Sequence, residues 1–312
     1  MRDVPCALCG ETEHLALFHA CDRLYGVAGM FRVVRCLRCG LLRTLPQPEP
    51  HELRRWYPED RYYAYAPRRT AFARRAWRAP LLALRYFPGP LLGPILAAVA
   101  KRPPGRVLDV GCGAGEFLDL CAALGWQTVG VELSPRAVEL ARGAGHEAYC
   151  ADFLSAPLSP GSFQLIHMSH VLEHMPDPLA ALRHARELLA PDGLLIVRVP
   201  NIGSPWARAF GCDWYPLDVP RHLWHFSRDT LLAALGKASL APVRLRTRTF
   251  CPLWSLMLRG ARRRAGGLSP SVFRPPGRLR LLLWQLATAP PRLLSNLLGL
   301  GDELIALAAP EH

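Results

Sequence analysis

Glycines and an acid follow a short apolar run in a pattern that suits binding of a nucleotide-like ligand. Residues 107–110 (Val-Leu-Asp-Val) are typical of a buried strand, and residues 111–115 (Gly-Cys-Gly-Ala-Gly) form a turn before an amphipathic helical pattern. Such a turn lets backbone amides approach a ligand closely. Glu116 stands where a dinucleotide fingerprint has its third glycine, so the spacing indicates a different ligand.

Acids also follow the next two predicted strands. Glu132 comes after Gln127–Val131, and a carboxylate there can accept hydrogen bonds from both hydroxyls of a ribose. Ala151-Asp152-Phe153 ends a short third strand, and a fourth, Phe163–Met168, runs into the histidine-containing segment 169–178. A doubly wound domain with an empty or different site is the alternative, but it does not explain acids at the ends of three successive strands.

The order and spacing of these segments resemble class I S-adenosylmethionine (SAM) methyltransferases. V-L-D-x-G-C-G-x-G is similar to their motif I, and Ser169–Pro178 is similar to the segment after strand four in small-molecule methyltransferases, including the ubiquinone-biosynthesis O-methyltransferases. The resemblance implies an α/β, Rossmann-like domain with a mostly parallel seven-stranded sheet. It also implies a SAM site formed by Asp109, Gly111, Cys112, Gly113, Gly115, Glu132, Leu133, Asp152, Phe153 and Ser169.

In that family, the acid at the position of Glu132 binds the SAM ribose and the residue at Leu133 lies by the adenine. The acid at Asp152 meets the adenine amino group. These roles are expectations that the resemblance implies for this chain.

Two C-x-x-C-G segments open the chain and supply four thiolates. Their cysteines are Cys6, Cys9, Cys36 and Cys39. Four sulfurs are the ligand set of a tetrahedral structural zinc. An iron–sulfur centre, a redox pair or a site that has lost its metal are the alternatives. A closed four-cysteine site has no open coordination position, so we predict a role in folding and none in catalysis.

A zinc-binding unit ahead of a SAM domain resembles an arrangement in bacterial sugar C-methyltransferases and related enzymes of polysaccharide and natural-product gene clusters. It also occurs in one group of ribosomal RNA guanine methyltransferases. We predict a zinc ribbon at 1–45, a linker with a lid or helical segment at 46–100, the SAM-binding domain at 101–252 and a basic C-terminal helical region at 253–312. The linker includes three tyrosines that we expect either to close over the site as a lid or to pack on the core: Tyr62, Tyr63 and Tyr65. We predict a helix over Leu81–Ala100, before the first strand.

A fifth strand is predicted at Gly193–Pro200, and a late antiparallel strand at Val243–Phe250. Between them, Asp213–Ser227 is dense in aromatic residues, histidine and proline, and in the class I family this region faces the acceptor substrate. An oxygen or carbon acceptor must lose a proton, which histidine can take near neutral pH. The candidates for this catalytic role, in order, are His222, His225, His170 and His174; a structural role for His174 is the alternative. Arg221 is a candidate clamp for a phosphate of a nucleotide-linked substrate.

The charge of the chain favours anionic partners. The formal net charge is +13, and arginine supplies almost all of the positive charge. No signal peptide and no unbroken apolar run of spanning length is visible, which predicts a cytoplasmic protein with reduced cysteines. The arginine- and leucine-rich tail from Arg259 has three interpretations. It is a surface that contacts the inner membrane face, a segment that forms a dimer or caps the substrate, or a helical subdomain with a solvated basic face.

These features together predict a SAM-dependent methyltransferase that acts on an oxygen or carbon of a small molecule, with a sugar, sugar nucleotide or glycan precursor as the expected acceptor. The first alternative is a zinc-ribbon RNA methyltransferase. A nucleic-acid partner is not expected, because the segment after strand four lacks the N/D-P-P-Y/F type of motif and the arginines cluster in the tail. The second is a non-catalytic SAM-binding module in a membrane-associated assembly.

Overall fold

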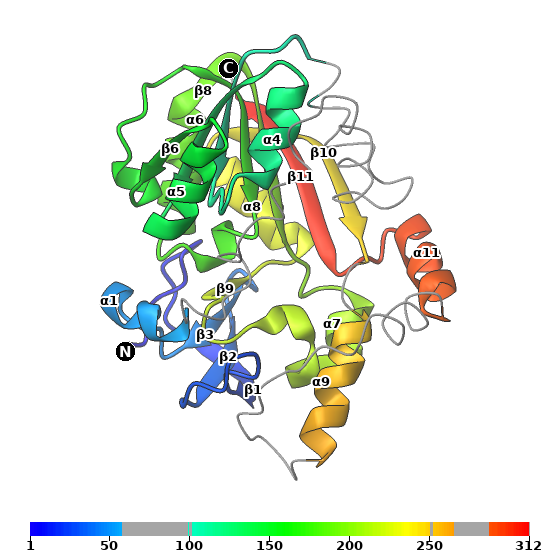
Figure 1. Ribbon diagram of the computed structural model, residues 1–312. Coiled ribbons are helices and arrows are strands. Elements are labelled where there is room, and N and C mark those ends of the chain that lie inside the picture. Colours follow the sequence, from blue (N-terminus) through cyan, green and yellow to red (C-terminus); the bar gives the residue numbers. More distant parts are fainter. Residues whose placement is uncertain (58–98, 100–101, 250–251, 265–286, 312) are drawn as a thin grey trace.

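Two β-sheets organise the chain (Figure 1). The computed structural model describes residues 1–57, 99, 102–249, 252–264 and 287–311. The predicted tyrosine lid (Tyr62, Tyr63 and Tyr65) lies outside the described residues, as does the helix predicted over 81–100 apart from the buried Val99.

The larger sheet has seven strands in the order β10-β11-β8-β7-β4-β5-β6. Five strands pair in parallel, and the remaining two, β11 and β10, extend the sheet in antiparallel pairs. This arrangement confirms the predicted Rossmann-like fold. The strands are β4 (Arg106–Val110), β5 (Gln127–Glu132), β6 (Glu147–Cys150), β7 (Phe163–Ser169), β8 (Leu189–Pro200), β10 (Leu240–Arg248) and β11 (Glu303–Pro310).

The central strands are apolar because both faces of the sheet are covered. Val107, Leu108 and Val110 of β4 are all buried, as expected of a parallel strand between helices. Helices lie on both faces of the sheet, and its parallel strands all end at one edge (Figure 1). The helices are α4 (Glu116–Ala123), α5 (Pro135–Gly143), α6 (Pro178–Leu188) and α8 (Arg228–Lys237).

The smaller sheet is antiparallel and combines residues from distant parts of the chain. Its order is β1 (His14–Ala20), β2 (Phe31–Cys36), β3 (Leu42–Leu45) and β9 (Trp224–His225). In β9, Trp224 pairs with Arg43 and His225 with Leu42. The cysteine-containing unit therefore does not fold separately from the region predicted to face the acceptor; the two share a sheet.

A short helical stretch after residue 45 also packs on the N-terminal unit. It consists of α1 (Pro50–Leu53) and the 3-10 turn η1 (Arg54–Trp56). The Trp56 ring is buried against Phe31 in β2, with ring centroids 5.8 Å apart. The predicted boundary at 45 thus falls inside a continuous apolar cluster.

The end of the chain corrects one boundary. Helices α9 (Pro252–Arg264) and α11 (Ala289–Leu297) lie in the predicted basic helical region, but Glu303–Pro310 forms β11 between β8 and β10. Its side chains are buried over most of its length, because it is an internal strand with neighbours on both sides. The seven-stranded sheet therefore includes residues 303–310, which the sequence predicts to be part of the basic C-terminal helical region.

Three smaller boundaries also differ from the predictions. The fifth strand begins at Leu189, four residues before the predicted start, and the late strand β10 runs from Leu240 to Arg248. The third strand ends at Cys150, and Asp152 instead caps a 3-10 turn, η5 (Phe153–Ser155), by accepting the backbone N–H of Leu154 at 2.9 Å.

Candidate functional site

The glycine turn after β4 lies at the end of the large sheet where the parallel strands finish. Gly111, Gly113 and Gly115 have φ values of 69°, 50° and 83°, which L side chains rarely adopt. A Cβ atom at Gly111 would lie 2.6 Å from Cγ2 of Val171, in the loop after β7. The turn is thus closely packed against the segment that carries the candidate histidines.

Glu132 lies beside this turn with a fixed carboxylate. Its Oε2 accepts the backbone N–H of Gly113 at 3.1 Å, and its Oε1 accepts that of Ser134 at 3.0 Å. The neighbouring Leu133 is 66% exposed, which leaves an apolar surface uncovered next to the acid. An acid, an exposed apolar side chain and an accessible glycine turn fit a nucleoside such as the adenosine of SAM.

Three of the predicted SAM residues present no side chain to this edge. The buried carboxylate of Asp109 accepts a hydrogen bond from Nδ1 of His167 at 2.8 Å. The Cys112 side chain packs toward Gly130, and the Phe153 ring belongs to the core. Cys112 and Phe153 can face a cofactor only through their backbone, whereas Asp152 is exposed and Ser169 is half-buried at the end of β7.

His170 is held between two buried carboxylates. Its Nδ1 lies 3.2 Å from Oε1 of Glu173 and its Nε2 lies 2.9 Å from Oε1 of Glu303, in β11. Burial opposes the charged form, but the two carboxylates raise the pKa of His170 to about 9. Both ring nitrogens are occupied and protonated, so His170 is not placed to accept a proton. Its backbone has a φ of 55°, in the left-handed region that non-glycine residues rarely adopt.

Glu303 was not predicted from the sequence. It also accepts a hydrogen bond from Nη2 of Arg198 at 2.7 Å, and Arg198 and His170 hold the pKa of this carboxyl well below its usual range against the effect of burial. It lies in β11, where the sequence predicts a helical region. Recognising residues 303–310 as a strand of the sheet would have indicated Glu303 as a site residue.

The rings of His174, in the turn after β7, and His222, in the segment predicted to face the acceptor, lie next to each other. Their ring centroids are 4.5 Å apart, at an interplanar angle of 84°. Nδ1 of His222 donates to the carbonyl oxygen of Pro216 at 2.8 Å, and Nδ1 of His174 donates to that of Arg221 at 2.9 Å. Burial lowers the pKa of both, most strongly for His222, which also faces His174, His225 and His170. Both rings are therefore neutral near pH 7, with Nε2 as the unprotonated nitrogen.

His225 has a structural environment. Its Nε2 donates to Oγ1 of Thr44 at 3.0 Å, and the Thr44 hydroxyl donates to the carbonyl oxygen of His222 at 2.8 Å. Burial lowers the pKa of His225 to about 3. These contacts join β3 to the histidine segment.

Arg221 is not available as a phosphate clamp, which corrects that prediction. The side chain is completely buried. Its guanidinium donates to Asp22 at 2.7 Å, to Asp218 at 2.5 Å and to the carbonyl oxygen of Trp56 at 2.9 Å. Asp22 is a missed residue whose partner lies 199 positions away, and no local pattern signals that pairing.

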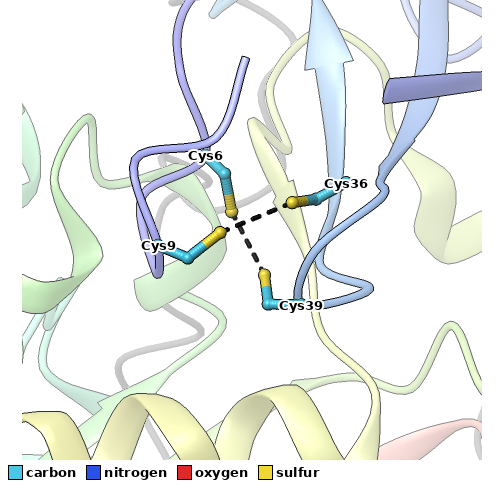
Figure 2. Close-up of side chains that lie close together, drawn as sticks. All are labelled: Cys6, Cys9, Cys36 and Cys39. Atoms are coloured by element: carbon cyan, nitrogen blue, oxygen red, sulfur yellow. Dashed lines mark hydrogen bonds between the residues drawn. The ribbon is translucent and has the colours of Figure 1, made fainter. Parts of the chain in front are cut away.

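The four cysteines of the N-terminal unit converge on one point from two turns (Figure 2). The Sγ atoms of Cys6 and Cys39 are 3.3 Å apart, and those of Cys9 and Cys36 are 3.5 Å apart. In a tetrahedral site with Zn–S bonds of about 2.3 Å, the sulfurs are about 3.8 Å apart, so a small expansion admits the ion. The structure thus brings together the four cysteines that their spacing predicts to share one metal ion.

Comparisons with known proteins agree on one family. A family model described as a methyltransferase domain matches residues 83–245. The ubiquinone biosynthesis O-methyltransferase of Xanthomonas campestris pv. campestris is 36% identical over 173 residues, covering 50% of this chain and 70% of that protein. The protein of the same name from Cereibacter sphaeroides is 32% identical over 169 residues, covering 49% and 68%.

Solved structures with a similar fold include the 1,6-didemethyltoxoflavin-N1-methyltransferase of Burkholderia thailandensis with bound S-adenosylhomocysteine. It matches with a TM-score of 0.48 and 18% identity, over 92% of this chain and 98% of that one.

Proposed function

We propose, from the premise that this chain belongs to the class I SAM-dependent methyltransferases, that it methylates a hydroxyl oxygen of a small molecule. The observation that carries proton removal from an acceptor is the neutral His222, whose Nδ1 donates to the carbonyl oxygen of Pro216 and leaves Nε2 unprotonated. This chemistry suits an oxygen or a carbon acceptor, and the relatives named O-methyltransferases support oxygen.

The proposed cofactor site uses residues at the ends of the parallel strands. Glu132 binds the ribose hydroxyls, Leu133 covers the adenine and Asp152 meets its amino group, while the turn at 111–115 supplies backbone contacts. SAM supplies a methyl group on a positively charged sulfur, which an acceptor oxygen displaces in line. The chain mainly aligns the reactants.

The proton of the acceptor hydroxyl is proposed to pass to Nε2 of His222. His174 orients this ring by edge-to-face contact, and His225 fixes the backbone of the segment through Thr44. We propose His170 as a fixed positive charge that positions Glu173. Of the four histidines predicted as catalytic, His222 keeps the role of proton acceptor.

The acceptor class is a finer proposal. A sugar, sugar nucleotide or glycan precursor is supported by the resemblance of the N-terminal unit, while the curated relatives point to an intermediate of ubiquinone biosynthesis. The burial of Arg221 removes one argument for a phosphate-bearing acceptor. A turnover assay with both acceptor classes distinguishes them, because only the true class yields S-adenosylhomocysteine above the background without acceptor.

We also propose a structural zinc at the four cysteines and a cytoplasmic location with peripheral contact at the inner membrane face. Among the described helices, none has the length and apolar character to cross a membrane. The membrane contact is supported by exposed leucines on and just after α11, including Leu293, Leu294, Leu297 and Leu298, and by the basic charge of the chain. Flotation with anionic but not with neutral vesicles is the expected result, and equal recovery from both would contradict it.

The replacement Glu132→Ala tests the cofactor site. Loss of the carboxylate leaves ribose hydroxyls without acceptors, so SAM binding should weaken by about 1–3 kcal/mol. Isothermal titration calorimetry of the folded, metal-replete protein measures the change. Glu139→Ala, an exposed acid on α5, is the matched control and should bind SAM as the wild type does. Undiminished binding by Glu132→Ala would contradict the assigned site, and no binding by the wild type would contradict the proposed function.

A further inference from the structure

Glu173, His174 and His222 form a cluster that the SAM site does not use. One donor atom of each residue lies within 4.8 Å of the others. Glu173 and His174 come from the 3-10 turn η6 (Leu172–His174), and His222 comes from the segment before β9. Two imidazoles and a carboxylate are a donor set that binds divalent transition metals.

The hydrogen bonds outside the cluster prepare both histidines as ligands. A carbonyl oxygen can only accept, so Nδ1 must carry the hydrogen in both His174 and His222. The hydroxyl oxygen of Tyr57, 2.8 Å from Nδ1 of His174, shares the same donor. Nε2 of each ring is left with a lone pair. Metal-binding histidines almost always donate their second nitrogen to such an outer oxygen, which fixes the tautomer and the ring.

The carboxylate of Glu173 provides an independent sign of a missing partner. Its side chain is 1% exposed, and within the described part of the chain its Oε2 has no hydrogen-bond partner. Its Oε1 lies 3.2 Å from Nδ1 of His170 and 3.9 Å from Nε2 of His222. A buried carboxylate oxygen without a partner is costly, and a cation between these groups would satisfy it.

We infer that Glu173, His174 and His222 bind a divalent transition-metal ion on the acceptor side of the site. Three protein ligands leave coordination positions open. Oδ2 of Asp218 also lies 3.9 Å from Nε2 of His222, close enough to contribute through a small shift. This site differs from the four-cysteine site in ligand type, since it offers nitrogen and oxygen and no sulfur.

The catalytic consequence of this ion rests on the proposed function. An ion with open positions would bind an acceptor hydroxyl and lower its pKa, so that the proton would pass to solvent water while the oxygen takes the methyl group of SAM. The lone pair of His222 Nε2 cannot bind a metal and accept a proton at once. The role of proton acceptor given to His222 above therefore describes the ion-free protein.

Titration with Mn²⁺ followed by electron paramagnetic resonance tests the site. Mn²⁺ prefers oxygen and nitrogen ligands, so it should leave the thiolate site to zinc. We expect the full-length wild type to bind one Mn²⁺, and Glu173→Gln and His174→Gln each to weaken binding at least about tenfold. The matched control His184→Asn changes a half-buried histidine on α6 that lies outside the cluster, and it should retain binding.

Two further measurements keep the inference falsifiable if a variant folds poorly. Circular dichroism and SAM calorimetry establish that each protein is folded, and pulsed spectroscopy of the wild type detects coupling from histidine nitrogen to bound Mn²⁺. Absence of Mn²⁺, Co²⁺ or Zn²⁺ binding beyond one zinc per chain, bound Mn²⁺ without nitrogen coupling, or undiminished binding in the folded Glu173→Gln protein would each overturn the inference. These binding readouts need no acceptor, so they are independent of whether methyl transfer is observed.

Discussion

Cys36→Ser should remove the zinc proposed for the N-terminal unit, unfold that unit and abolish methyl transfer, with SAM binding largely retained. Structural zinc supplies about 10–16 kcal/mol of apparent folding free energy in zinc-finger peptides, so losing a ligand is expected to be severe. The loss should reach the acceptor side because β3 pairs with β9 and the Thr44 hydroxyl holds the carbonyl oxygen of His222. Metal analysis, SAM calorimetry and turnover on the same preparation measure the three effects.

A chelator would remove both the zinc and the ion proposed at Glu173. A cysteine variant removes the zinc alone, so it separates the effects of losing the two ions. Cys212→Ser is the matched control, since Cys212 is half-buried and lies outside the four-cysteine cluster. It should retain one zinc and full turnover. Full activity in a zinc-free Cys36→Ser protein would show that the N-terminal unit does not support the acceptor site. Loss of SAM binding along with activity would indicate that the two sheets fold as one unit.

The parallel part of the large sheet was predictable from the sequence because its signals are local. Apolar runs, a glycine turn and an acid at the end of a strand are written within about a dozen residues of one another. The last strand, β11, was not predictable in the same way. Its run of leucine, isoleucine and alanine follows a leucine-rich helix, and periodicity alone does not separate a buried strand from a buried helix.

The residues of the candidate site also differ in whether their sequence signals are local. Cys6, Cys9, Cys36 and Cys39 were predicted to meet from their spacing, and their sulfurs do meet in the structure. The cluster around Glu173 depends instead on tertiary contacts, because His222 reaches it from a segment about fifty positions later. A histidine or arginine in an aromatic segment does not reveal its burial, and Arg221 was therefore assigned to a phosphate that its buried position excludes.

Arg221→Met should destabilise the protein by about 3–5 kcal/mol, the usual cost of removing one partner from a buried ion pair. The guanidinium lies between Asp22, Asp218 and the carbonyl oxygen of Trp56, and the Asp22 and Arg221 side chains are inaccessible to solvent. A methionine fills the volume but leaves the carboxylate of Asp22 with backbone donors only, from the turn after β1. Urea denaturation of the metal-replete protein measures the loss.

The double variant Arg221→Met with Asp22→Asn distinguishes an unpaired charge from lost packing. If the cost arises from the uncompensated carboxylate, removing that charge should recover part of the stability, and the two changes will not be additive. Arg228→Met, an exposed arginine at the start of α8, is the matched control and should stay within about 0.5 kcal/mol of the wild type. A loss of unfolding free energy below about 1 kcal/mol for Arg221→Met would contradict the view that this arginine links the N-terminal unit to the histidine segment. Removing one partner of a buried ion pair that joins two segments should cost more than that.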